Sequence, residues 1–188
     1  MYNINLGSVK AGAMVVDLAT AKINSNIEFD EAANDAFLQI LLDAAVQDAE
    51  GYTGTIILER ETAQIEFSNW DDIGYLPVSP INAIGSVKYF DEAGAEQTVD
   101  ANDYKLLKGS PGQLDKLVFL WDGAPNLSAD KILPITITFS AGFSNSEMPA
   151  KIKSAIMLRF SHKELYREEM PTSVNRTFYS SLREFKRW

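Results

Sequence analysis

The histidine and cysteine content of this chain limits the chemistry that its side chains can do. His162 is the only histidine among 188 residues, and there is no cysteine. Thiol nucleophiles, cysteine zinc sites, iron–sulfur clusters and sites that need two imidazoles are therefore excluded. A catalytic role for His162 needs an oriented acid partner and a nucleophile. We expect instead a surface or partly packed residue within a helix.

Three acidic stretches carry residue types that suit carboxylate chemistry or calcium binding. Asp71 and Asp72 are adjacent acids, and paired carboxylates hydrolyse glycosides when they flank a cleft. Residues 91–92 and 100–103 superficially resemble calcium loops, but neither has the spacing D-x-[DN]-x-[DN]-G-x5-E. Polar loops or turns are expected at all three places. The glycine patterns of phosphate-binding loops do not occur, so we predict no catalytic residue, no metal and no cofactor.

The C-terminal end combines aromatic, aliphatic and basic residues, a composition typical of interface hot spots. Such an apolar surface, left in water, marks an interaction site. The alternative is a terminal helix that docks on its own domain. The candidate interaction residues are Phe178, Tyr179, Leu182, Arg183, Phe185, Lys186, Arg187 and Trp188.

Charge is distributed unevenly along the chain, whose net charge is −9. Residues 1–149 hold 8 Lys+Arg and 22 Asp+Glu, whereas residues 150–188 hold 9 and 4. The acidic body disfavours nucleic-acid binding, which depends on clustered Lys and Arg that neutralise phosphates. The basic end could contact nucleic acid or an acidic protein surface, or could simply be a solvated helix face.

Helical patterns lie toward both ends of the chain. Asp17 can cap a short helix over residues 18–22. The strongest helix is predicted over residues 31–50, with Asp30 as its N-cap and Gly51 as its stop. Its expected buried stripe is Ala33, Phe37, Ile40, Leu41, Ala44 and Ala45.

A further helix should begin at Pro149 and end at Pro171, and a last short one should cover residues 176–186. The expected buried stripe of the helix from Pro149 is Ile152, Ala155, Ile156 and Phe160. Strand patterns with a period of two lie between the helical segments. The predicted strands are residues 62–67, 104–107, 116–121 and 135–139, with a hairpin over 84–99 whose turn is 91–94. Two prolines exclude an interior strand at 75–80.

These patterns predict an α+β fold, with helices from both ends packed together around or beside a small, mostly antiparallel sheet inserted between them. We expect a single domain over residues 1–188. Its parts are an N-terminal arm (1–16), a helical part (17–54), a β-rich insertion (55–142), a helix (149–170) and a C-terminal partner-binding segment (171–188). Neither a signal peptide nor a membrane span is expected, because every apolar run is too short.

Several stretches, in this order, resemble the head–tail connector (adaptor) proteins of tailed bacteriophages. They are Asp48-Ala49-Glu50-Gly51-Tyr52-Thr53-Gly54, the proline-containing run 76–91, Asp103-Tyr104, Phe139-Ser140-Ala141-Gly142-Phe143, and Met148-Pro149 before a helix that contains His162. The resemblance covers roughly residues 17–167.

The resemblance implies a structural virion protein without enzymatic activity. Such connectors form rings, typically of twelve subunits, that extend the DNA channel at the head–tail junction. Their partners are the portal protein and a stopper or tail-completion protein, and the C-terminal segment commonly engages the portal. Assembly in the bacterial host cytoplasm is implied, and the acidic body would keep DNA from adhering to the channel wall.

Two other classes of function stay open from the sequence. One is a small hydrolase or carbohydrate-active domain that uses Asp71 and Asp72. The other is a generic binding module with a partner-docking C-terminal helix. A sizing measurement distinguishes the connector from these alternatives. A connector forms rings or joins a portal, whereas a small enzyme turns over substrate as a monomer or dimer.

Overall fold

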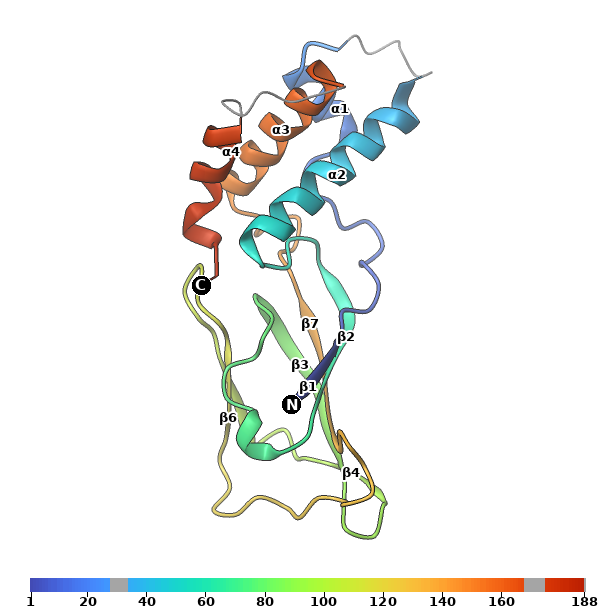
Figure 1. The fold of residues 1–188 in the computed structure, drawn as a ribbon, viewed down its shortest axis with the longest axis vertical. Helices are drawn as coiled ribbons and strands as arrows, with labels where there is room; N and C mark the ends of the chain where they lie inside the picture. The colour runs from blue at the N-terminus through green and yellow to red at the C-terminus, as the bar shows by residue number, and fades with distance from the viewer. Residues whose placement is uncertain (28–33, 168–174, 188) are drawn as a thin grey trace. The chain divides into compact units, whose positions relative to one another are not determined.

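Helices occupy the two ends of the chain and most strands occupy its middle (Figure 1). The computed structural model describes residues 1–27, 34–167 and 175–187. Two compact units are present: residues 1–11 with 58–142, here called the β unit, and residues 12–57 with 143–188, here called the helical unit. The predicted α+β class, with helices at both ends and a mostly antiparallel sheet, is confirmed.

In its described residues, the helical unit contains four helices and a short 3-10 turn. They are α1 (Leu18–Asn24), α2 (Asp35–Thr53), α3 (Ala150–Leu165), α4 (Asn175–Leu182) and η4 (Arg183–Phe185). Helix α3 packs against both α2 and α4, and Figure 1 shows these three helices side by side. The predicted cap of α1 is confirmed, because the Asp17 carboxylate accepts a hydrogen bond from the Thr20 amide at 2.8 Å.

The buried face of α2 is rotated from the predicted stripe: Ala45 is buried as predicted, and Leu41 and Ala44 are only half-buried. Phe37 and Ile40 are 42% and 63% exposed, so they do not belong to the core. The prediction was wrong because α2 carries two adjacent apolar stripes. The stripe that extends into the last turn of the helix is the one that is buried. The buried residues of α2 are Leu38, Leu42, Ala45, Val46, Ala49 and Thr53.

Helix α2 ends at Gly54 and not at Gly51. Gly54 has a left-handed φ of 67°, and its amide donates to the Glu50 carbonyl at 2.8 Å. Such a glycine ends a helix because it lacks the Cβ that disfavours this conformation. Gly51 is simply tolerated inside the last turn. The predicted N-cap Asp30 and the stripe residue Ala33 lie outside the described residues.

The predicted start and buried face of α3 are confirmed. Pro149 directly precedes the helix, and Ile152, Ala155, Ile156 and Phe160 are all buried. The helix ends at Leu165, before the expected Pro171, which lies outside the described residues. The predicted last helix is present as α4 and η4.

The β unit contains a five-stranded antiparallel sheet. Its strand order is β1-β2-β7-β3-β4. The bounds are β1 (Tyr2–Asn5), β2 (Arg60–Phe67), β3 (Ile81–Phe90), β4 (Glu96–Thr98) and β7 (Ile135–Ala141). Thus the extended conformation expected for residues 1–16 includes an edge strand. Alternate residues of β7 are buried, so one face of the sheet is the core face.

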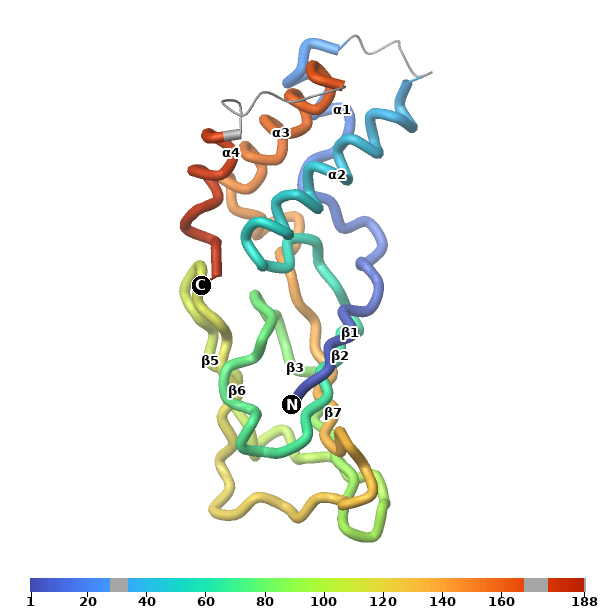
Figure 2. The backbone as a smooth tube through the Cα atoms, in the orientation of Figure 1, coloured from blue at the N-terminus to red at the C-terminus, as the bar shows by residue number. Residues whose placement is uncertain are grey.

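A two-stranded antiparallel ribbon of β5 (Tyr104–Leu107) and β6 (Lys116–Phe119) forms the second sheet of this unit (Figure 2). Its connection to the sheet is built around Asp115, which is only 2% exposed. The Asp115 carboxylate accepts hydrogen bonds from the amides of Ile81 at 2.7 Å and Gly109 at 2.8 Å. This buried charge is therefore satisfied, as a low-dielectric interior requires, and it joins the loop of the ribbon to β3.

Four aromatic rings pack together in the β unit. Trp70, from the 3-10 turn η2 (Trp70–Asp72), lies edge-on to Tyr89, Phe119 and Trp121, with centroid distances of 5.0–5.4 Å. Its indole N–H donates to the Pro125 carbonyl at 2.8 Å. Phe119 and Trp121 are stacked at 4.4 Å. Such a cluster fixes side chains from β3, η2 and β6 in one arrangement.

Candidate interaction surfaces

Three predicted apolar anchors of the C-terminal segment are core residues of the helical unit. Phe178, Leu182 and Phe185 are 1%, 0% and 6% exposed. The expectation that these side chains are free to anchor a partner is therefore wrong. Their spacing places them on one face of α4 and η4, and α4 packs on α3 and α2. Burial within the chain removes the same apolar surface from water that a partner would have covered.

The end of the segment is also tied to the C-terminal end of α2. The Arg187 amide donates to the Thr53 carbonyl at 2.9 Å, and the Thr55 hydroxyl donates to the Phe185 carbonyl at 3.0 Å. The Tyr179 ring lies 4.7 Å from the Tyr52 ring. These contacts hold residues 175–187 as an ordered part of the unit.

Part of the basic charge of the C-terminal half is neutralised within the chain. The Asp48 carboxylate of α2 accepts a hydrogen bond from the Arg159 guanidinium at 2.7 Å and lies 3.1 Å from the Lys163 ammonium. The Arg159 guanidinium also lies 5.2 Å from the centre of the Phe178 ring. Arg159 thus links α2, α3 and α4 through one ion pair and one cation–π contact.

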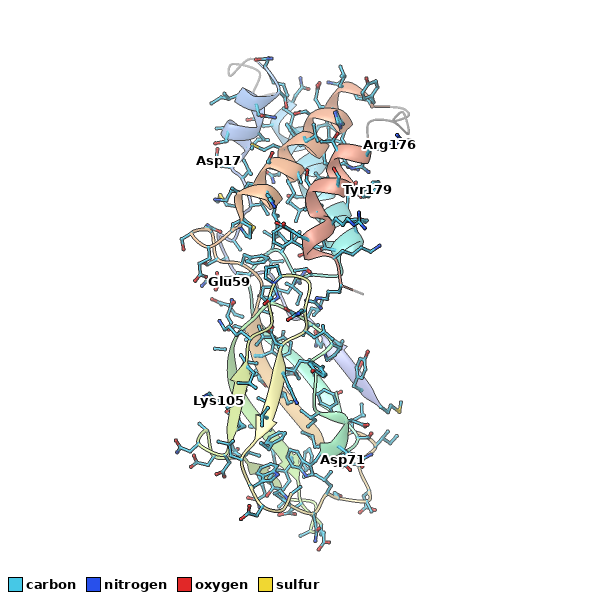
Figure 3. The ribbon with its side chains drawn as sticks, turned by 90° about the vertical axis from the view of Figure 1, so that its left-hand side faces the viewer. Asp17, Glu59, Asp71, Lys105, Arg176 and Tyr179 are labelled. Atoms are coloured by element: carbon cyan, nitrogen blue, oxygen red, sulfur yellow. The ribbon has the colours of Figure 1, made fainter. Side chains whose placement is uncertain are left out.

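The exposed part of the predicted interaction set is polar and basic. Tyr179 is 38% exposed, Arg183 is exposed, and Lys186 and Arg187 are half-buried. The Lys186 ammonium lies 4.9 Å from the centre of the Tyr52 ring. Figure 3 labels Tyr179 on the helix that carries this surface. Trp188 lies outside the described residues.

The residues whose side chains could take part in catalysis, His162, Asp71 and Asp72, do not assemble into an active site. His162 is half-buried in α3, where burial and, to a lesser extent, the nearby Arg159 lower its pKa. Asp71 and Asp72 are both exposed, and the Asp72 carboxylate accepts a hydrogen bond from the Ser68 hydroxyl at 2.7 Å. Among the described residues, no group of three His, Asp or Glu side chains could hold a metal ion.

The two stretches that resemble calcium loops are turns. The Asp91 carboxylate accepts hydrogen bonds from the amides of Ala93 and Ala95 and from the side chain of Gln97, and these bonds lower its pKa. The Asp100 carboxylate accepts from the Asn102 amide at 2.8 Å. Both acids shape the local backbone, as Asp commonly does in turns. Across the parts of the chain that the structure describes, no helix has the length and apolar character to cross a membrane.

The fold of this chain recurs in solved structures of gene transfer agent (GTA) particles. They are a virion of a native particle (TM-score 0.79, 20% identity), the neck of an empty particle computed with C6 symmetry (0.75, 21%) and the neck of a native particle computed with C12 symmetry (0.71, 19%). The matches cover 98–100% of this chain and 95–96% of theirs. At these identities the likeness concerns the fold.

The family assignment comes from the sequence itself. No curated protein gives a significant match. The model of the family described as phage gp6-like head-tail connector protein matches residues 15–107. This range includes α1, α2 and the first strands of the β-rich middle, where much of the sequence resemblance lies. Residues 15–107 thus match the phage gp6-like head-tail connector family, which confirms the family that the resemblance predicted.

Proposed function

We propose that this chain is a non-enzymatic structural protein at the neck of a phage-type particle, where copies of it form a ring between head and tail. The single observation that carries the proposal is the match of residues 15–107 to the head-tail connector family. Chains of the same fold, matched over nearly their whole length, occur in neck structures computed with C6 and C12 symmetry. That symmetry supports a ring of twelve copies.

The proposed partners follow from this position. The portal protein lies on one side of the ring, and a stopper or tail-completion protein lies on the other. DNA passes through the ring without specific binding, since the net charge of −9 repels phosphates. Assembly takes place in the cytoplasm of the bacterial host. In the ring the chain acts as one connector domain in which residues 171–188 form the partner-binding segment.

The geometry revises how the C-terminal segment would meet the portal. Because Phe178, Leu182 and Phe185 are buried, the contact surface consists of Tyr179, Arg183, Lys186 and Arg187, joined by Trp188. Tyr179 and Arg183 are presented by α4 and η4, so this part of the segment loses little conformational entropy when it binds. Repetition of a modest contact around a ring strengthens attachment through avidity.

The hydrolase alternative has no support from the described site geometry. Asp72 is hydrogen-bonded to Ser68, and Asp71 and Asp72 both belong to the short η2 turn. Two acids that act on a glycosidic bond must flank it from opposite sides, at about 5–10 Å from each other. Neighbouring residues of one turn do not provide that arrangement.

Electron microscopy of the purified chain, alone and mixed with its portal protein, tests the proposal. Closed rings, or attachment of the chain to portal rings, are expected. Arg183→Glu combined with Lys186→Glu should weaken attachment to the portal without unfolding the chain, whereas Lys88→Glu combined with Lys131→Glu should not. A chain that forms no ring and joins no portal in either preparation would refute the proposed function.

A further inference from the structure

The β5–β6 ribbon carries the opposite charge to the unit that contains it. Lys105, Lys108 and Lys116 lie in residues 104–119, here called the basic ribbon, and its only carboxylate is Asp115. That carboxylate is buried and accepts hydrogen bonds from two backbone amides. The outer surface of the basic ribbon is therefore cationic, although the chain as a whole is acidic.

Strand pairing shows which side chains form the outer face of the ribbon. Lys105 pairs with Val118, and Leu107 pairs with Lys116, so these four side chains share one face. Lys105 is exposed and Leu107 is 46% exposed. Figure 3 labels Lys105 on the outside of β5.

The other face of the ribbon is turned toward the core. Leu117 is 1% exposed, and the Phe119 ring belongs to the aromatic cluster around Trp70. Tyr75 extends the outer face: it is 65% exposed, and the Lys116 ammonium lies 5.5 Å from the centre of its ring. The outer face thus combines cations with apolar and aromatic side chains, of which Leu107 and Tyr75 are exposed.

The two exposed lysines of the basic ribbon, Lys105 and Lys108, lack ion pairs of the kind that Lys10 and Lys88 make in the same unit. Lys10 pairs with Glu59 at 3.0 Å, and Lys88 pairs with Glu96 at 2.8 Å. Within the described residues, neither Lys105 nor Lys108 lies within 4.0 Å of a carboxylate oxygen. A carboxylate supplied from outside the chain can therefore approach both ammonium groups.

The same unit carries a surface of complementary character. An open hollow of about 340 Å³ is lined by Tyr89, Asp91, Glu92, Ala93, Pro125 and Asn126. Asp91 shapes the turn, and Glu92 is exposed. The hollow therefore offers two carboxylates beside an aromatic ring, which suits a lysine whose aliphatic stem lies on the ring while its ammonium meets the acids.

We propose that the basic ribbon of one chain docks on the acidic hollow of a second copy of the same chain. A protein partner is favoured over nucleic acid because Leu107, Val118 and Tyr75 give the outer face apolar area, whose burial a phosphate backbone does not provide. The two surfaces differ, so the contact is heterologous and repeats from copy to copy, and it closes into a ring when the rotation permits. This inference rests on the proposed function and names the contact that builds its ring.

The test compares the association of designed variants by light scattering after size exclusion, at low and at high salt. The wild type should associate at low salt and move toward the 20.9 kDa monomer as salt screens the contact. Lys105→Glu combined with Lys108→Glu should remain monomeric. The control, Lys151→Glu combined with Lys153→Glu on α3, changes the net charge equally but belongs neither to the ribbon nor to the hollow, and should associate like the wild type.

A charge swap identifies the second surface. Glu92→Lys alone should prevent association, and mixing that variant with the Lys105→Glu, Lys108→Glu variant should restore it. The inference is overturned if the ribbon variant associates like the wild type, or if the wild type stays monomeric. It is also overturned if the wild type retards a DNA duplex in a gel and the ribbon variant does not. Rings that survive in the ribbon variant would leave the proposed function intact while refuting this contact.

Discussion

Replacing Phe178 by Ala tests whether the C-terminal segment is part of the core of the helical unit. The ring is 1% exposed, and the Arg159 guanidinium and the Tyr179 ring lie 5.2 Å from its centre. A buried Phe→Ala replacement removes the transfer free energy of the ring and leaves a cavity, which costs about 3–5 kcal/mol. With a urea m-value of about 2 kcal/mol/M, the midpoint should fall by roughly 2 M.

The assay is urea denaturation followed by circular dichroism at 222 nm, which reports on helices. Trp70 and Trp121 both belong to the β unit, so tryptophan fluorescence in a background where Trp188 is replaced by Phe follows that unit separately. The matched control is Thr177→Ala on the exposed face of the same helix, which should change stability by no more than about 0.5 kcal/mol.

If Phe178→Ala and Thr177→Ala both unfold at the same urea concentration as the wild type, Phe178 is not a core residue of the helical unit. That result would mean that α4 does not stabilise the unit, and the segment would again be a candidate for a free anchor. Because Phe178 and Thr177 are neighbours on one short helix, a change in helix propensity alone cannot separate their effects by several kcal/mol.

Two further predictions concern the β unit. Gly142→Ala should lower the stability of the unit by about 1–3 kcal/mol, because φ is +94° and an added Cβ would clash with the Leu58 carbonyl oxygen. Gly123→Ala, with nothing within 4 Å of its Cβ, is the control, and tryptophan fluorescence during thermal unfolding measures both. The pKa of Asp91 should lie below its ordinary value of 3.8, because the Gln97 side chain and backbone amides donate to the ionised carboxylate. The stabilising contribution of the ionised Asp91 carboxylate is therefore present above pH 4 and is lost as the pH falls through the lowered pKa. An NMR titration of Asp91 with a midpoint at or above 3.8 would contradict this prediction.

Periodicity predicted the elements whose buried face is unambiguous. Residues 135–139 alternate between apolar and polar types, and they form the centre of β7, with one face in the core. The helix from Pro149 has a single apolar stripe, and that stripe is buried. In α2, by contrast, Phe37 and Ile40 stand beside Leu38 and Leu42 on adjacent stripes, so burial depends on which neighbour packs there.

The surfaces were harder to predict because they depend on contacts between distant residues. A terminal segment such as 175–187 has the same apolar residues at helical spacing whether it packs on its own helices or on those of a partner. The basic ribbon is visible in the sequence only as alternating residues in 104–107, and its outer face is defined by a pairing with 116–119. Likewise, no local pattern indicates that Asp115 is buried, because its hydrogen bonds reach Ile81, far from it in the chain.

The assembly of the helical unit from two ends of the chain constrains when it can fold during synthesis on the ribosome. The hydrogen bond from the Thr55 hydroxyl to the Phe185 carbonyl spans 130 positions. Helix α2 emerges early, but Leu42, Ala45 and Ala49 stay uncovered until α3 and α4 have been made. A nascent chain that has reached residue 142 therefore contains all strands of the β unit, whereas the apolar face of α2 is still uncovered. Such long-range closure slows folding and exposes a surface on which chaperones, or other nascent chains, can act.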